Sequence, residues 1–140
     1  MAVDVIEKAI YSVLANDANV GGLVGVKIFP VRVPQGTAMP AITYEQLTGP
    51  REHTMDGPFG MAAPTWAITS WASSYGGARA LADYVRLALD GYDSTVGTVK
   101  VYVGMLENEV DVSEGSADIS ATYRWGKRQT YVIWHEEATA

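Results

Sequence analysis

The two histidines, His53 and His135, are the residues best suited to proton transfer or metal binding near neutral pH. His135 is followed by Glu136 and Glu137, but a second histidine at the spacing of a zinc-protease motif is missing. The chain has no cysteine, and no glycine-rich phosphate loop or GxSxG serine motif is present. We therefore expect no catalytic residue, no metal and no cofactor.

A row of acidic residues is the most informative charge feature. Between Val101 and Tyr123 the sequence contains no lysine or arginine. Alternation along a strand gives these acids no reason to share a pocket as an acid–base pair. One interpretation is a solvated surface that protects a projecting edge, and the other is a surface that lies near a polyanion without holding it. The acidic row consists of Glu107, Glu109, Asp111, Glu114 and Asp118.

Three basic residues, Arg124, Lys127 and Arg128, follow the acidic row directly. Three cations in a chain of net charge -6 make a poor phosphate-binding patch. We expect them to form salt bridges with acids on the same hairpin or on an adjacent subunit.

Length and composition limit the class of protein. A chain of 140 residues, 48% hydrophobic and 19% charged, is expected to form a single globular domain over residues 1–140. The net charge of -6 disfavours a protein that grips nucleic acid or anionic lipid. No apolar run reaches the roughly 20 residues of a membrane span, and we expect neither an anchor nor a signal peptide.

Two helices are predicted from apolar periodicity. The first covers Val3 to Asn16, where Asp4 and Glu7 have the spacing of a capping box. The second runs from Ser74, a suitable N-cap, to Asp90, with Gly91 placed for a left-handed C-terminal residue. Between them, residues 20–25 indicate a short turn or helical fragment.

The strands are predicted from β-branched and aromatic residues. Ala41–Leu47 and Thr65–Ala72 have this pattern, and the latter places Trp66 and Trp71 on opposite faces. Residues 27–33 form an extended piece, while prolines make 29–39 an ordered loop or sheet edge. A tryptophan outside the core would suit a carbohydrate platform or an interface.

The C-terminal third is strand-like, but its apolar positions change from odd to even numbers at Gly104. We expect a one-residue bulge or bend near Gly104 and Met105, with a projecting acidic hairpin over residues 105–125 that turns at 113–116. Residues 135–140 are expected to be a frayed tail. The resulting fold class is α+β: a mainly antiparallel β-sheet with two α-helices packed on one face and long hairpin or loop extensions.

Residues 48–64 are predicted to form a long connection without regular structure. Apolar side chains in such a loop either fold back onto the domain or dock on a partner, and both readings remain open. The candidate interface residues in this loop are Arg51, His53, Met55, Phe59 and Met61.

Several short segments along the chain match the sequence pattern of one known family. The N-terminal half carries Ile28-Phe29-Pro30, then Val33-Pro34-Gln35-Gly36 and Pro40-Ala41-Ile42-Thr43-Tyr44. Later, residues 71–75 run into 78–83 and close at Asp90-Gly91, a strand that passes into a helix. With Asp56-Gly57-Pro58 and residues 128–134, these segments resemble, over nearly the whole chain, the tail-completion, or tail-terminator, proteins of long-tailed bacteriophages, which join head and tail.

The resemblance implies a virion protein of the tail and neck, assembled in the host cytoplasm, that is not an enzyme. Such a protein forms a ring, typically hexameric, that ends polymerisation of the tail tube and meets the connector of the head. Its partners would be copies of itself, the tube protein and the connector, while DNA passes through without specific binding and no membrane is involved. We expect the acidic row to face that channel. The alternative is a non-catalytic carbohydrate- or peptide-binding module.

Overall fold

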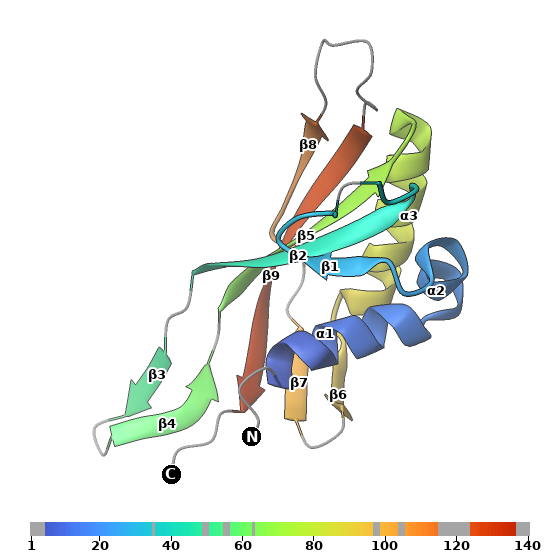
Figure 1. Cartoon of the computed structure of the whole chain (residues 1–140). Coiled ribbons are helices and arrows are strands. Elements are labelled where there is room, and N and C mark those ends of the chain that lie inside the picture. The colour runs from blue at the N-terminus through green and yellow to red at the C-terminus, as the bar shows by residue number, and fades with distance from the viewer. Residues whose placement is uncertain are drawn as a thin grey trace.

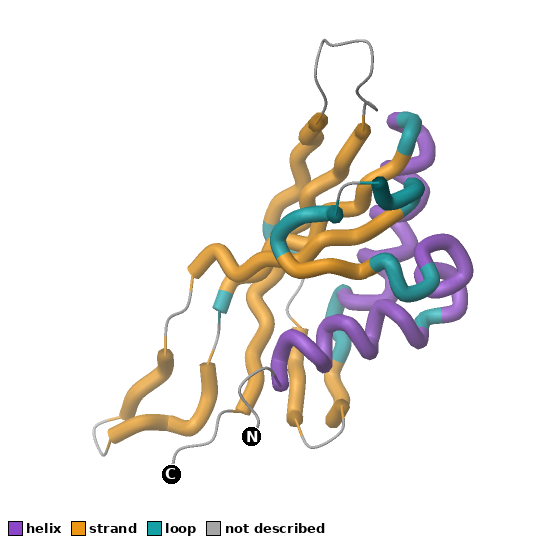
Figure 2. The backbone as a smooth tube through the Cα atoms, in the orientation of Figure 1, coloured by secondary structure: helices purple, strands orange, loops and turns teal. Residues whose placement is uncertain are grey.

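The computed structural model describes residues 5–34, 36–48, 51–54, 57–62, 64–96, 99–103, 106–114 and 124–136. Helices lie on one side of a long, twisted sheet, and strands extend past the helices at one end (Figures 1 and 2). The elements in chain order are α1 (Val5–Asn16), α2 (Ala18–Val24), β1 (Ile28–Pro30), β2 (Ala41–Thr48), β3 (Arg51–Thr54), β4 (Gly57–Ala62), β5 (Thr65–Ala72), α3 (Tyr75–Leu89), β6 (Asp93–Val96), β7 (Val99–Val103), β8 (Asn108–Glu114) and β9 (Arg124–Glu136).

The long helices α1 and α3 confirm the helices predicted from periodicity. Ser74 Oγ accepts a hydrogen bond from Gly77 N at 3.1 Å and so caps α3. Gly91 has a φ of 73°, the left-handed conformation expected just after a helix. The proposed capping box is not tested, because Asp4 lies outside the described residues.

A third helix corrects the prediction of two. Residues 20–25, interpreted as a short turn or helical fragment, lie mostly in α2, which begins at Ala18, so the helical alternative is confirmed. Its N-cap is Asp17, whose carboxylate accepts hydrogen bonds from Asn19 N and Val20 N, both at 3.0 Å. The two glycines inside α2 weakened its sequence signal, because glycine is a poor helix former.

The thirteen-residue strand β9 is the centre of the sheet. On one edge it pairs with β5 and then β4, and on the other with β8 and then β7. β2 continues the sheet from β5, and β6 pairs with β7. Only β1, which pairs with β2, is parallel to its neighbour among the described strands. The predicted α+β class with a mainly antiparallel sheet is confirmed.

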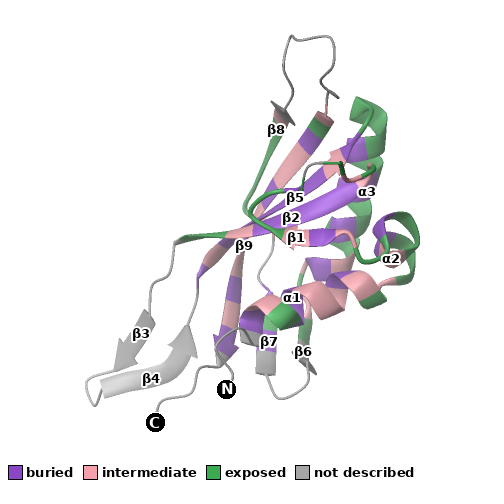
Figure 3. Ribbon diagram, viewed as in Figure 1, coloured by how far each residue is buried: buried purple, intermediate pink, exposed green. Residues whose placement is uncertain are grey.

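The core lies between the helices and one face of the sheet (Figure 3). Even-numbered β5 residues such as Trp66 and Ile68 share this face with odd-numbered β9 residues such as Tyr131, because directly paired residues point to the same side. Trp71 lies on the opposite, uncovered face, where its indole N–H donates to Thr43 Oγ1 at 3.0 Å. The predicted placement of the two tryptophans on opposite faces is therefore confirmed.

The prolines end regular pairing as expected. β1 stops at Pro30, and residues 31–34 and 36–40 contain no strand. Proline has no amide hydrogen to donate, so it is tolerated at the end of an edge strand.

The break between β7 and β8 inserts two residues rather than one. Val103 pairs with Ile133 and Asn108 with Thr130, so two more residues separate the pairing positions on this side than on β9. An even insertion leaves each side chain on its original face, whereas a one-residue slip would exchange the faces. The even-numbered Val110 therefore lies on the uncovered face. Gly104 and Met105 lie outside the described residues.

Three predicted boundaries also change. Residues 51–54 and 57–62 are not structureless but form β3 and β4. β8 continues through the expected turn at Ser113 as far as Glu114, which pairs with Arg124. β9 extends to Glu136, which pairs with Met61, so the strand enters the expected tail. Pairing across the sheet supplies the backbone hydrogen bonds that the local sequence pattern did not reveal.

Tyr131 is a buried polar exception in the core. Its side chain is fully buried, its hydroxyl has no hydrogen-bond partner among the described residues, and burial raises its pKa well above the usual value. Because the folded state holds the hydroxyl proton of Tyr131 more tightly than the unfolded state, the free energy of unfolding is highest below pH about 10 and falls as pH rises further.

We expect Tyr131→Phe to stabilise the protein by about 1 kcal/mol and to reduce this loss of stability at alkaline pH. Urea unfolding at pH 7 and pH 11 measures both effects, and an unchanged alkaline slope would contradict the assignment.

Candidate assembly surfaces

The acidic hairpin is formed by β8 and the first half of β9, and it lies beside the start of α3 (Figure 1). Among its acids, Glu107, Glu109 and Asp111 have exposed side chains. Glu114 lies at the end of β8, opposite Arg124, and its side chain lies outside the description, as does the whole of Asp118. The structure therefore places four members of the acidic row on or beside one strand.

Asp111 is held in a local cluster rather than left free. Lys127 Nζ lies 2.7 Å from Asp111 Oδ1, and the Tyr75 hydroxyl donates to the same carboxylate at 3.3 Å. The hydrogen bond from Lys127, with its charge, lowers the pKa of Asp111. This ion pair confirms the expectation that Lys127 bridges to the hairpin. Tyr75 was missed because nothing in its local sequence shows that α3 begins beside β8.

Glu109 and Arg128 also have partners. Gln129 Nε2 donates to Glu109 Oε2 at 2.8 Å, while Arg128 Nη2 lies 2.6 Å from Glu45 Oε1 on β2. Glu107 forms no ion pair within the described segments, although its backbone N–H donates to the carbonyl oxygen of Thr130. Arg128 therefore pairs across the sheet rather than along the hairpin. Glu107 remains the described acid best placed to act through its charge alone.

The arm formed by β3 and β4 is the second candidate surface. β3 pairs with β4, and β4 joins β9 through Met61–Glu136 and Ala62–His135. The arm lies at the end of the sheet away from the acidic hairpin (Figure 1). Of the candidate interface residues, Arg51 and His53 lie on β3 and Phe59 and Met61 on β4. Their side chains lie outside the description, and so does all of Met55.

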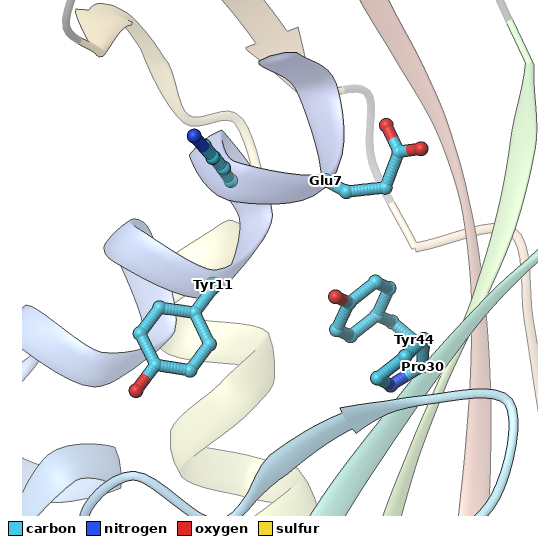
Figure 4. Close-up of a pocket in the computed structure, with 5 residues that line it drawn as sticks. Glu7, Tyr11, Pro30 and Tyr44 are labelled. Carbon is cyan, nitrogen blue, oxygen red and sulfur yellow. The ribbon is translucent and has the colours of Figure 1, made fainter. Parts of the chain in front are cut away.

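One hollow of about 600 Å³ lies between α1 and the edge formed by β1 and β2 (Figure 4). Its residues come from three separate elements, so no local sequence pattern connects them. Two tyrosine rings and a proline make most of the lining, and the single carboxylate and ammonium do not form a metal-ligand set. The lining residues are Glu7, Lys8, Tyr11, Pro30 and Tyr44.

The described segments contain no group of three or more histidines, cysteines or acids placed to hold a metal. None of the helices in those segments is long and apolar enough to cross a membrane. The features that stand out are extensions and surfaces suited to protein contacts.

A family model described as "Tail completion protein gp17" matches residues 8–124. The chain therefore belongs to this tail completion family and is a structural component of a phage-like tail. No curated protein matches it in sequence.

A solved structure shares the fold. It is a chain of a structure titled "Virion of native gene transfer agent (GTA) particle", with 20% sequence identity and a TM-score of 0.55. The similarity covers 90% of this chain and 91% of that one.

Proposed function

We propose that the protein caps the tail tube as a ring, ends tube polymerisation and joins the tail to the connector of the head. The observation that carries the proposal is the tail completion family match over residues 8–124. The β3–β4 arm at one end of the sheet and the acidic hairpin at the other support it, because a ring subunit must contact neighbours on both sides. No catalytic step is part of this function.

A central channel follows from subunit size. A domain of 140 residues has a radius of gyration of about 14 Å. Six such bodies in a closed ring leave an opening about one subunit wide, which admits a DNA duplex. We assign the acidic row to the rim or wall of this channel, where negative charge repels the phosphate backbone and lets DNA slide. The β3–β4 arm then reaches a neighbouring subunit or the tube.

Electron microscopy of the purified protein, alone and mixed with tail tubes, tests the ring directly. We expect an annular cap at one end of each tube and no growth of capped tubes when tube protein is added. Tubes that continue to grow from both ends would overturn the proposal. The same images give the number of subunits and which surface meets the tube.

The channel assignment is tested by reversing one charge with Glu107→Lys. Because Glu107 forms no ion pair with any other described residue, the ring is expected to form normally. DNA release from assembled particles should slow, since a cation in the channel attracts phosphate. Asp83→Lys, an equal charge reversal on exposed α3, is the control and should leave release unchanged. Loss of rings in the Glu107 variant would contradict the channel assignment.

A further inference from the structure

We propose that copies in the ring contact one another through two surfaces of opposite charge, which we call the aromatic patch and the Asp93 row. This inference rests on the proposed ring. The aromatic patch lies where α3 begins beside β9, and the Asp93 row crosses β6, β7 and β9. The aromatic patch consists of Tyr75, Arg79, Trp125 and Lys127, and the Asp93 row of Asp93, Tyr102 and Trp134.

Two exposed aromatic rings form the centre of the aromatic patch. Tyr75 is 41% exposed and Trp125 is 38% exposed. Their ring centroids lie 6.1 Å apart at an interplanar angle of 85°, an edge-to-face contact. Tyrosine and tryptophan are the residues that most often dominate binding energy in protein interfaces. A pair held in contact at the surface is therefore a suitable anchor for another protein.

The Asp111 cluster fixes this pair in place. Lys127 Nζ lies 5.5 Å from the centroid of the Tyr75 ring and 2.7 Å from Asp111 Oδ1. The Tyr75 hydroxyl is also held by Asp111. Because the ring is already ordered before association, binding loses less side-chain entropy.

The charge of the aromatic patch favours an acidic partner. Arg79 is exposed and lies one helical turn after Tyr75, on the same side of α3. Lys127 is already paired with Asp111, so Arg79 is the cation of the patch that forms no ion pair among the described residues, and the N-terminal end of α3 adds partial positive charge. The remainder of this chain is acidic, with sixteen acids against ten bases overall. A second copy therefore carries the complementary charge.

The Asp93 row supplies that charge together with aromatic surface. Asp93 pairs with Tyr102 and Tyr102 pairs with Trp134, so the three side chains share one face across three strands. This is the uncovered face, since the neighbouring Val101 and Val103 point into the core. Asp93 is exposed, Tyr102 is 46% exposed and Trp134 is half-buried. The row therefore presents one acid beside two aromatic rings.

The two surfaces are placed for a ring rather than a two-fold dimer. Trp125 faces the helix side of β9 and Trp134 faces the uncovered side, nine residues further on, which is about 30 Å along a strand. A contact between different surfaces of identical subunits is head-to-tail, and it closes into a ring when the rotation allows.

A charge exchange tests the pairing of Arg79 with Asp93. We expect Arg79→Glu and Asp93→Arg each to weaken association at least tenfold, and the double variant to recover most of that loss because opposite charges face each other again. Sedimentation velocity and native mass spectrometry, with and without tail tubes, measure association, and circular dichroism confirms folding. Arg86→Glu, an exposed arginine two turns further along α3, is the control and should associate normally.

The outcomes separate the two proposals. If the single variants form rings like the wild type, or the double variant is weaker than both, the two surfaces are not the contact, although the ring function stands. If wild-type protein never caps tubes but its self-association still responds to the charge exchange, the surfaces are supported and the capping function fails.

Discussion

Gly126→Val is expected to destabilise the protein by about 3 kcal/mol, although valine is the better strand former. Gly126 lies on β9 between Trp71 of β5 and Val112 of β8, all on the uncovered face. A Cβ at this position would lie 2.7 Å from Val112 Cγ2 and 2.8 Å from the Trp71 ring. The indole is also anchored by its hydrogen bond to Thr43, so it cannot move aside without losing that bond.

Thermal unfolding measures the effect of Gly126→Val, with an expected fall of about 10 °C in the melting temperature. The control is Gly76→Ala in α3, where an added Cβ meets nothing within 4 Å. Alanine favours the helix over glycine, so this variant should gain about 0.5 kcal/mol. A valine variant as stable as the wild type would show that the contact of Trp71 and Val112 over Gly126 does not constrain the sheet.

Gln129→Ala is expected to cost about 3 kcal/mol and to loosen β8. Gln129 is fully buried, and its Nε2 donates to Ala82 O in α3 at 3.0 Å and to Glu109 Oε2 in β8 at 2.8 Å. One amide group thus ties the helix layer and the acidic hairpin to β9. Alanine leaves a cavity and removes both hydrogen bonds.

Urea unfolding and amide hydrogen exchange measure the two consequences of Gln129→Ala. Gln129→Met, which keeps most of the volume, should cost only about 1 kcal/mol yet still raise exchange in β8. Gln46→Ala on the exposed part of β2 is the control and should change stability by less than about 0.5 kcal/mol. Unchanged exchange in β8 for both Gln129 variants would contradict the proposed tie.

The acidic hairpin shows which features a local sequence pattern predicts and which features it does not. The alternation of Glu107, Glu109 and Asp111 predicts a strand, and the absence of basic residues predicts an acidic surface. Their partners Lys127 and Gln129 become neighbours only through the register of β8 with β9. The local pattern therefore predicts the acids, but not that two of them, Glu109 and Asp111, anchor the hairpin.

The sequence by itself determined the α+β class, the long helices with their Ser74 cap and Gly91 end, and the opposite faces of Trp66 and Trp71. These features depend on periodicity and on groups a few residues apart. Only the tertiary structure decided the remainder: the strands β3 and β4, the two-residue insertion before β8, and the meeting of Tyr75 with Asp111 and Lys127. The physical reason is that strand pairing and surface clusters join residues far apart in the chain, and no local interaction encodes their register.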